Sequence, residues 1–451
     1  MTEPLVRALA AGLMLLAYAA MCLAIWRRER RRHAADARAA RALAGDGQQP
    51  PVLVLFASQT GQAEAIAWQT GRALHAQGTP ARVMSLNELD APTLHAAQQA
   101  LFVASTYGEG DAPDGASLFT ETLMGTAQAL PALRYALLAL GDRQYAHFCG
   151  FARALDGWLQ SCGAVPLAPR IEVDNGDPAA LAEWHAQWGG GALEATEDAA
   201  FAPWQLVSRT LLNAGSEGGP VFHLGLRPPA GVAMQWQSGD LAQIALADDP
   251  GRPRDYSIAS LAADGELQLL VRQECHPDGT LGKASGLLTS TLALGDSVAL
   301  RVRAHRNFRL DDNAGRPLIL IGNGTGLAGL RSHLRARARA GQHDNWLLFG
   351  ERHAAHDQLY RDELEAWQAE GVLQRLDRVF SRDQTERLYV QHRLLQASDA
   401  VQAWLARGAA VYVCGSLQGM AGGVDAALRQ IAGDATVREL TASGRYRRDV
   451  Y

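Results

Sequence analysis

The sequence predicts an α/β plus β fold: a doubly wound parallel sheet, then an antiparallel barrel, then a second α/β domain. Three observations lead to this class. Residues 51–200 repeat a pattern of apolar run, small polar loop and helix. Residues 221–303 hold short alternating strands broken by Gly and Pro turns. Residues 317–331 return to strand, glycine turn and helix. One transmembrane helix near the N-terminus completes the predicted fold class.

Length and composition set the first limits. At 451 residues the chain is too long for one ordinary core, so two or three domains are expected. The net charge is −5, but residues 51–200 alone carry 16 acidic and 6 basic residues. This acidic region argues against nucleic acid as a partner and favours a basic protein surface.

The cysteines exclude two further classes of protein. Five are present, and none forms a C-x-x-C pair. This pattern matches neither a disulfide framework nor a zinc site, so we predict a reducing compartment and no metal site.

Residues 8–26 are nineteen uncharged residues, enough for a helix to cross about 28 Å of bilayer hydrocarbon. An arginine-rich stretch at residues 27–32 follows, and the positive-inside rule keeps that end in the cytoplasm. A cleaved signal peptide is the alternative, because Ala17-Tyr18-Ala19 resembles a cleavage site. Residues 33–50 have no apolar period and are predicted to be a flexible linker.

The apolar run at residues 52–56 is typical of a buried parallel strand, and it leads into a loop of small hydroxyl residues and a helical pattern. Such a loop at a helix N-terminus forms an anion site, because backbone N–H groups and the helix dipole hold a phosphate without a basic side chain. A capped helix without a ligand is the alternative. The candidate residues are Ser58, Gln59, Thr60, Gly61 and Gln62.

Two later loops also follow apolar strands, at residues 101–105 and 136–140. Ligands of open α/β sheets bind beyond the carboxyl ends of the strands, so the three loops should converge on one crevice. Each later loop supplies glycines for close backbone approach and a tyrosine for stacking on a flat ring. The candidate residues are Thr106, Tyr107, Gly108, Gly110, Gly141, Asp142, Tyr145 and Phe148.

The motifs S-Q-T-G-x-A-E, S-T-Y-G-E-G-D and L-G-D-x-x-Y-x-H-F-C stand in this order and resemble the flavodoxin-like FMN domain of the diflavin reductases. That family includes the sulfite reductase flavoprotein subunit and NADPH–haemoprotein reductases. The resemblance implies that residues 58–62 hold the FMN phosphate while Tyr107 and Tyr145 flank its ring. It also places an acidic residue, Asp174, near the flavin.

The middle of the chain holds a second flavin pattern at residues 254–257. Arg254 can pair with a pyrophosphate as a planar fork, Tyr256 offers a flat ring, and Ser257 offers a hydroxyl. An ordinary strand with one surface arginine is the alternative. The stretch resembles the R-x-Y-S of the family, which implies FAD. A second segment resembles the family's G-V-A-T, where a helix N-terminus meets the FAD pyrophosphate; it comprises Gly286, Leu287, Leu288 and Thr289.

The chain departs from larger relatives in one respect. They place a helical connecting segment within the FAD region, whereas only about a hundred residues separate Phe201 from Phe308. We therefore predict a short form of the family without that segment.

The glycine turn at residues 322–326 lies between a strand and a helix and suits a pyrophosphate. In the family pattern G-x-G-T-G-x-A-P-F-R, this chain has Gly329 and Leu330 in place of Pro and Phe, which predicts a looser helix start. Hydroxyls and arginines at 381–389 stand where the family holds the 2′-phosphate of NADPH, although a solvated polar loop is the alternative. The predicted nucleotide-binding residues are Gly324, Thr325, Gly326, Ser381, Arg382, Arg387, Tyr389 and Gln391.

The resemblance implies that electrons pass from NADPH to FAD, then to FMN, then to an external acceptor. Ser257, Cys414 and Asp449 would surround the reacting rings, with Asp449 stabilising positive charge on the nicotinamide. Tyr451 is the terminal aromatic that stacks on FAD. Ser416 stands where many relatives have Asp, which predicts a modest change in nicotinamide handling.

We therefore expect a membrane-anchored NADPH-dependent diflavin oxidoreductase, single-pass in a bacterial-type inner membrane, with its catalytic domains in the cytoplasm. Its acceptor would be a haem or iron protein with a basic docking face. The alternatives are a flavoprotein component feeding sulfite reductase, which the anchor disfavours, and a membrane-tethered flavin-binding sensor without turnover. The predicted parts are an anchor with its basic flank (1–32), a linker (33–50), a flavodoxin-like FMN domain (51–200), an FAD-binding barrel (201–312) and an NADP-binding domain of the ferredoxin reductase type (313–451).

Overall fold

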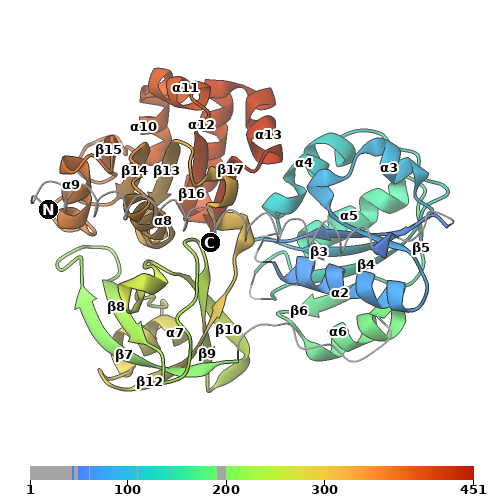
Figure 1. Cartoon of the computed structure of the whole chain (residues 1–451), viewed down its shortest axis with the longest axis horizontal. Helices are drawn as coiled ribbons and strands as arrows, with labels where there is room; N and C mark the ends of the chain where they lie inside the picture. The colour runs from blue at the N-terminus through green and yellow to red at the C-terminus, as the bar shows by residue number, and fades with distance from the viewer. Residues whose placement is uncertain (1–42, 45–48, 60, 109, 144, 190–199) are drawn as a thin grey trace, which may run out of the picture.

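The computed structural model describes residues 43–44, 49–59, 61–108, 110–143, 145–189 and 200–451. Their strands form three sheets, which Figure 1 shows as three bodies that meet near the C-terminus. The sheets span residues 52–174, 202–303 and 318–450. The boundaries between the domains stay predictions.

The first sheet is parallel, in the order β2-β1-β3-β4-β5, with β6 also paired to β4. Its central strands are almost wholly apolar because helices cover both faces: α2 and α6 on one, and α3, α4 and α5 on the other (Figure 1). The strands are β1 (Val52–Ala57), β2 (Ala81–Ser85), β3 (Gln99–Ser105), β4 (Arg134–Gly141), β5 (Val165–Pro166) and β6 (Ile171–Asp174). The helices are α2 (Gln62–Ala76), α3 (Ala91–Ala96), α4 (Ser117–Phe119), α5 (Gly150–Ser161) and α6 (Pro178–Trp184).

The second sheet is antiparallel, in the order β10-β9-β12-β7-β8-β11. A bridge between Ile258 and Leu269 joins the end of β10 to β11, so the sheet curls on itself around an apolar interior. Between residues 202 and 303 the only long helical stretch is α7 (Lys283–Gly286) with the helical turn that follows it, so no helical domain interrupts the barrel. The strands are β7 (Ala202–Leu211), β8 (Val221–Arg227), β9 (Leu241–Leu246), β10 (Asp249–Ser257), β11 (Leu267–Arg272) and β12 (Ser297–Arg303).

The third sheet is parallel, in the order β15-β14-β13-β16-β17, with helices on both faces. Its glycine turn follows β13, where Gly326 has no room for a side chain because a Cβ would overlap the carbonyl oxygen of Cys414. The strands are β13 (Leu318–Asn323), β14 (Asn345–Glu351), β15 (Arg375–Phe380), β16 (Ala410–Gly415) and β17 (Tyr446–Val450). The helices are α8 (Leu327–Arg339), α9 (Arg361–Ala369), α10 (Val390–Gln396), α11 (Ser398–Ala406), α12 (Gly422–Ala432) and α13 (Asp434–Ala442).

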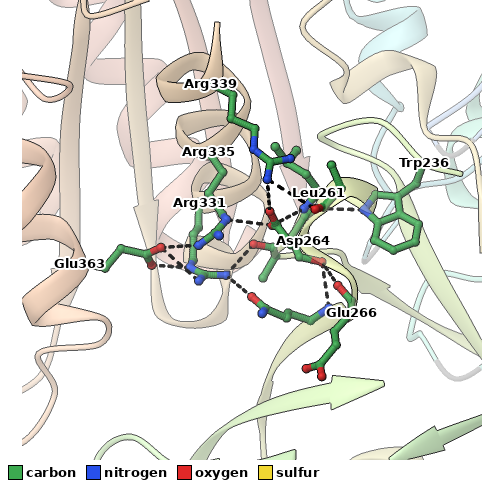
Figure 2. A network of polar contacts seen from close by, with 12 residues as sticks. Trp236, Leu261, Asp264, Glu266, Arg331, Arg335, Arg339 and Glu363 are labelled. Atoms are coloured by element: carbon green, nitrogen blue, oxygen red, sulfur yellow. Dashed lines mark hydrogen bonds and ion pairs between the residues drawn. The ribbon is translucent and has the colours of Figure 1, made fainter. Parts of the chain in front are cut away.

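Three arginines spaced four residues apart on α8 tie the third sheet to the barrel (Figure 2). Nη1 of Arg331 lies 2.7 Å from each of its two barrel acceptors. Arg335 and Arg339 reach one barrel carboxylate at 2.9 and 3.3 Å. The acceptors are Ala259, Asp264 and Gln268 of the barrel, with Glu363 of α9 binding Arg331 and Arg335 at 2.5 Å. This network fixes α8, and the glycine turn before it, against the barrel.

The transmembrane helix of the predicted fold class has to be corrected. Within the residues that the structure describes, no helix is long and apolar enough to cross a membrane. The longest, α2, has 15 residues, or about 22 Å, against the roughly 30 Å of a bilayer core. The predicted span at residues 8–26 lies outside the described residues. We therefore restate the fold class of the described residues as α/β plus β, and we withdraw the predicted inner-membrane localisation.

Candidate functional site

The loop predicted to hold the FMN phosphate lies at the carboxyl edge of the first sheet. Gly61 adopts a left-handed conformation with φ 88°, and its N–H donates to Ser58 Oγ at 2.9 Å. This turn brings the chain into α2 at Gln62, beside the buried Gln59. Thr60 lies outside the described residues. The described loop residues therefore gather at a helix start, as a phosphate site requires.

Two buried hydroxyls fit a flavin ring at the same edge. Within the described residues, Thr106 Oγ1 and Tyr107 OH have no hydrogen-bond partner. Leaving such groups unsatisfied is costly, and the carbonyl and N–H groups of a flavin would satisfy them. Burial, with the nearby Asp114 carboxylate, raises the pKa of Tyr107, so the phenol keeps its proton. Gly108 and Gly110 both have positive φ, which only glycine adopts readily.

The loop after β4 contributes residues of different exposure. Tyr145 is 46% exposed, in contrast to the partly buried Tyr107 across the same edge. A Cβ on Gly141 would lie 2.9 Å from the backbone nitrogen of Cys149, so the backbone packs closely here. Asp142 follows in the same loop. This loop therefore offers one exposed aromatic ring and a close backbone.

Phe148 and Asp174 have contacts that the sequence did not predict. Phe148 is buried in the core under α5, with the guanidinium of Arg143 lying 4.3 Å from its ring centre. Asp174 accepts the backbone N–H of Arg143 at 3.0 Å and lies 3.3 Å from Arg252 of the barrel. Phe148 therefore supports the loop, and Asp174 joins the first sheet to β10.

The predicted FAD stretch occupies the end of β10. Arg254 Nη1 donates to the carbonyl of Arg252 at 2.5 Å, and its Nη2 lies 3.3 Å from Asp249, so its guanidinium is held beside the strand. Tyr256 packs against the barrel core, and burial raises its pKa. Ser257 is buried at the end of the strand, where it faces the third sheet.

The second predicted FAD segment lies one turn later in its helix than expected. Gly286 is the last residue of α7, which begins at Lys283, and a wider helical turn carries Leu287, Leu288 and Thr289. The Thr289 hydroxyl donates to the carbonyl of Ser285 at 2.6 Å. The helix start is therefore at residues 282–283 rather than at Gly286.

Ser257, Cys414 and Asp449 meet in a buried cluster, although they are far apart in the chain. The Ser257 hydroxyl donates to Asp449 Oδ2 at 2.8 Å, and Cys414 Sγ lies 3.7 Å from the same oxygen. Burial, with the Asp449 carboxylate beside it, raises the pKa of the Cys414 thiol well above its usual range. The thiol therefore stays protonated and donates to the carboxylate rather than acting as a nucleophile.

The two departures from the family pattern have structural accounts. A Cβ on Gly329 would lie 3.1 Å from the Phe308 ring and 3.4 Å from Cys414 Sγ, so this glycine packs directly on the cluster. Leu330 is fully buried, and the looser helix start predicted from the sequence is not observed. Ser416 donates its N–H to Asn323 Oδ1 at 2.9 Å, next to the glycine turn.

A cavity of about 640 Å³ opens over the carboxyl edge of the third sheet. Its floor is the glycine turn, and its far wall is the polar loop after β15. It is lined by seven of the predicted residues, namely Gly324, Thr325, Ser381, Arg382, Tyr389, Gln391 and Tyr451. Gly326 is buried beneath the turn, and Arg387 is exposed and does not line the cavity.

Three charged residues of the cavity wall were missed by the sequence analysis: Arg272, Glu351 and Arg352. Burial raises the pKa of Glu351, and Arg272 at 2.8 Å opposes the shift. Glu351 and Arg352 directly follow the apolar run of β14, so their position after a strand could have identified them. Arg272 comes from the barrel, and only the packing of the two sheets brings it here.

Tyr451 ends the chain beside the cavity. Its hydroxyl lies 3.1 Å from Thr325 Oγ1, its N–H donates to the carbonyl of Gly415, and its own carbonyl accepts from Leu417. The ring is 57% exposed. Backbone bonds therefore hold the terminal residue while its ring stays accessible.

The first sheet contacts the other two through its phosphate loop. Asn307 Nδ2 donates to the carbonyls of Ser58 and Gln59 at 3.1 and 3.2 Å, and His305 Nε2 lies 3.1 Å from the Gln59 carbonyl. Gln59 Nε2 donates to the carbonyl of Arg448 at 3.2 Å, and a Cβ on Gly108 would overlap Leu417. The contacts join positions more than two hundred residues apart, so no local motif reports them.

Two family models match the chain. The flavodoxin model covers residues 54–189, and the oxidoreductase NAD-binding domain model covers residues 320–426. These ranges contain most of the first sheet with its three loops, and the glycine turn with its cavity.

Curated relatives match over nearly the whole chain. The sulfite reductase (NADPH) flavoprotein alpha-component of Vibrio cholerae serotype O1 is 30% identical over 537 residues, covering 88% of this chain and 87% of the relative. That of Bacillus subtilis is 28% identical over 538 residues, covering 89% of each chain. Both alignments are longer than this chain of 451 residues, so the relatives carry stretches that it lacks.

The comparisons and the three sheets agree on the family. The flavodoxin part binds FMN, and the oxidoreductase part binds FAD and NADPH, as predicted from the motifs. The chain belongs to the diflavin reductase family, as an NADPH-dependent flavin oxidoreductase similar to the sulfite reductase flavoprotein component.

Proposed function

We propose that this NADPH-dependent diflavin oxidoreductase passes its electrons to a separate redox protein, and that the sulfite-reducing component of a sulfite reductase is the first candidate. The observation that supports this most is the cluster of Ser257, Cys414 and Asp449, which lies beside the nucleotide cavity and near the phosphate loop. The names of the relatives favour the sulfite-reducing partner.

When bound, NADPH, FAD and FMN supply the redox chemistry, and the protein binds and orients them. Asp449 is placed to stabilise positive charge that develops on the nicotinamide, because its carboxylate is buried and fixed by the Ser257 hydroxyl. The protonated Cys414 thiol holds the same carboxylate. Tyr451 covers the position beside Thr325 and must move for a nicotinamide to enter.

For the 2′-phosphate of NADPH we propose Ser381 and Arg382, and we replace Arg387 by Arg352 as the second cation. Both Arg352 and Arg382 line the cavity, whereas Arg387 does not. Two guanidinium groups facing one dianionic phosphate would account for a preference for NADPH over NADH.

The predicted alternative of a membrane-tethered sensor without turnover is set aside, because the chain belongs to a family of NADPH-dependent oxidoreductases. Its proposed signs were the replaced residues at 329, 330 and 416, and each of them packs on the cluster or the glycine turn.

The acceptor should carry a basic face, because the first sheet lies in the acidic part of the chain. Some of that acidic surface already faces arginines of the third sheet and its helices: Asp114 pairs with Arg448, and Glu121 lies 2.6 Å from Arg429. An external acceptor would therefore compete for these carboxylates.

The test is to add NADPH, sulfite and a purified sulfite-reducing haem component to the FMN- and FAD-loaded chain. We expect NADPH oxidation that depends on sulfite and on both proteins, and haem reduction when sulfite is omitted. Ferricyanide reduction without the partner serves as the control for intact flavins. Active ferricyanide reduction with no transfer to the haem component would exclude this acceptor.

A further inference from the structure

His305 stands between the phosphate loop of the first sheet and the carboxylate of Asp449. Its Nε2 lies 3.1 Å from the Gln59 carbonyl oxygen, and its Nδ1 lies 3.9 Å from Asp449 Oδ1. The side chain is only 1% exposed. One buried ring therefore faces both the FMN-side loop and the cluster beside the nucleotide cavity.

The barrel side holds this ring in place. The His305 backbone N–H donates to Asp240 Oδ1 at 2.9 Å, and Asp240 is itself bound by Arg309 at 2.6 Å. The imidazole stacks on Phe308, with ring centres 6.1 Å apart and an angle of 22° between the planes. Movement of the phosphate loop would therefore remove a contact from His305 without displacing the ring.

Both ring nitrogens face oxygen atoms, but at different distances. Nε2 lies 3.1 Å from the Gln59 carbonyl, whereas Nδ1 has no hydrogen-bond partner in the described part of the chain and faces Asp449 Oδ1 at 3.9 Å. The Gln59 carbonyl therefore fixes the ring orientation in which Nδ1 is turned toward the carboxylate. The charged groups around the ring are Asp449 and Asp240, with Arg309 behind Asp240. A second histidine, His333, packs on the same Phe308.

Asp449 is then held on both oxygens. Oδ2 accepts the Ser257 hydroxyl at 2.8 Å, while Oδ1 faces His305. Cys414 Sγ also lies 3.7 Å from Oδ2, so both of the other contacts are on that one oxygen. Packing of His305 against Oδ1 restricts rotation of the carboxylate about its Cβ–Cγ bond, and the loop fixes the orientation of that ring.

We propose that His305 is a positioning residue through which docking of the phosphate loop fixes the carboxylate of Asp449. The proposal rests on the role proposed above for Asp449 and is independent of the electron acceptor. Arrival of the FMN-binding part would thereby prepare the site at which NADPH delivers its electrons.

The test uses the full chain loaded with FMN and FAD and compares His305→Ala with the unchanged protein. Amide hydrogen exchange at residues 57–62 should rise, because the loop loses a buried contact. Flavin reduction by NADPH, followed by stopped-flow absorbance, should slow about tenfold, because the Asp449 carboxylate is no longer restricted on the Oδ1 side, while the KM for NADPH changes less than about twofold.

Two further variants separate positioning from a general structural effect. His333→Leu removes the other buried imidazole on Phe308, whose nitrogens have no hydrogen-bond partner in the described part of the chain, and should change neither measurement. His305→Gln keeps one N–H donor, so loop protection should return while flavin reduction stays slow. If His305→Ala does not bind its flavins, His305→Gln alone tests whether His305 is a positioning residue.

Unchanged flavin reduction in both His305 variants would overturn the proposal, as would an equal loss in His333→Leu. Asp449→Asn separates this failure from that of the proposed function. Slow flavin reduction in Asp449→Asn beside normal His305 variants would exclude only the role of His305. Normal reduction in Asp449→Asn would exclude the role of Asp449, and this proposal with it.

Discussion

The third sheet meets two neighbours, and the two interfaces are built differently. Against the barrel it shares one apolar cluster, to which the barrel contributes Val221, Ala259 and Leu270. Among the described residues, the two apolar clusters of the first sheet contain only residues between 43 and 184, so no buried core is seen to continue from that sheet into the others. Of the residues described there, only the partly buried Tyr107 packs against a core of the third sheet.

The ion pairs of the two interfaces also differ, because those at the barrel interface are more deeply buried. In the barrel interface the carboxylates are buried: Asp264 is 5% exposed beside Arg335, and Glu351 is 4% exposed beside Arg272. Across the other interface, Arg429 and Glu121 are 27% and 33% exposed. Interfaces with partly exposed ion pairs and no shared core open more easily than those with a shared core. The barrel and third sheet should therefore behave as one unit, from which the first sheet can separate.

The largest effect should come from breaking the buried network with Arg331→Met. This change removes one of the two arginines that bind Glu363, since Arg335 stays at 2.5 Å, and it leaves two barrel acceptors without a donor. Leaving a buried acceptor without a donor costs about 1–3 kcal/mol each. We expect a lower thermal midpoint and early loss of FAD, measured by circular dichroism and flavin fluorescence.

Arg339→Met is the matched control on the same helix face. Its side chain is 52% exposed and its contact to Asp264 is 3.3 Å long, so the cost should stay below about 1 kcal/mol. Equal losses in the two variants would mean that burial does not distinguish these contacts.

The second prediction concerns nucleotide binding, which we assign to the unit formed by the barrel and the third sheet. Arg382→Ala should weaken NADPH binding about 10- to 100-fold and leave NADH nearly unchanged, because it removes one charge-assisted hydrogen bond to the 2′-phosphate. Titration of both coenzymes measures this. Arg387→Ala, outside the cavity, should bind both coenzymes normally. Equal loss of NADPH and NADH affinity would show that the 2′-phosphate lies elsewhere.

The residues in these two predictions show which features could be predicted from the sequence alone. The glycine turn and the strand–loop–helix repeats are local patterns, so they identified Gly324, Thr325 and the loops of the first sheet before any packing was known. The stretch at 381–389 was identified as a unit, yet only Ser381, Arg382 and Tyr389 of its predicted residues line the cavity. Which arginine of a polar loop faces inward depends on tertiary packing.

Contacts between sheets could not be predicted from the sequence either, because they too depend on tertiary packing. His305 and Asn307 stand in a polar stretch without a motif, and their partner Gln59 is about 250 residues away. The pairing of Arg448 with Asp114 likewise follows only from the docking of two separate sheets.

The third prediction concerns how pH changes stability at the interface between the barrel and the third sheet. His223 of β8 lies 2.8 Å from the Tyr360 hydroxyl, which precedes α9, and burial, with Arg331 nearby, lowers its pKa to about 4. The unfolded chain therefore binds a proton before the folded one does. Stability is fully present above the usual value of 6.5 and falls as the pH drops toward 4.

Between about pH 6.5 and pH 5.5 this histidine should cost about 1–1.5 kcal/mol of unfolding free energy. Urea unfolding of the unchanged chain and of His223→Gln at both pH values measures the difference. A variant with the same pH dependence as the unchanged chain would show that His223 is not buried in the neutral form.

The smallest effect should come from Asp114→Asn, which weakens the interface between the first and third sheets. Asp114 pairs with Arg448 across that interface, and both side chains are about one-fifth exposed. Removing the charge keeps the shape of the residue and should cost about 1 kcal/mol of docking, a roughly fivefold fall in the equilibrium constant for docking. Amide exchange at residues 57–62 should rise, while the thermal midpoint and NADPH affinity stay unchanged.

Two controls make this prediction specific to the ion pair. Asp111 is an exposed carboxylate in the same loop and bonds to Tyr107 through its backbone, so Asp111→Asn should leave loop exchange as it is. Raising the salt to about 1 M, where the Debye length falls to about 3 Å, should reproduce the effect of Asp114→Asn in the unchanged chain and add little in the variant. If Asp114→Asn also lowered the thermal midpoint by as much as Arg331→Met, the first sheet would be bound as firmly as the barrel. The proposed difference between the two interfaces would then be wrong, because separation of the first sheet would require unfolding of the rest.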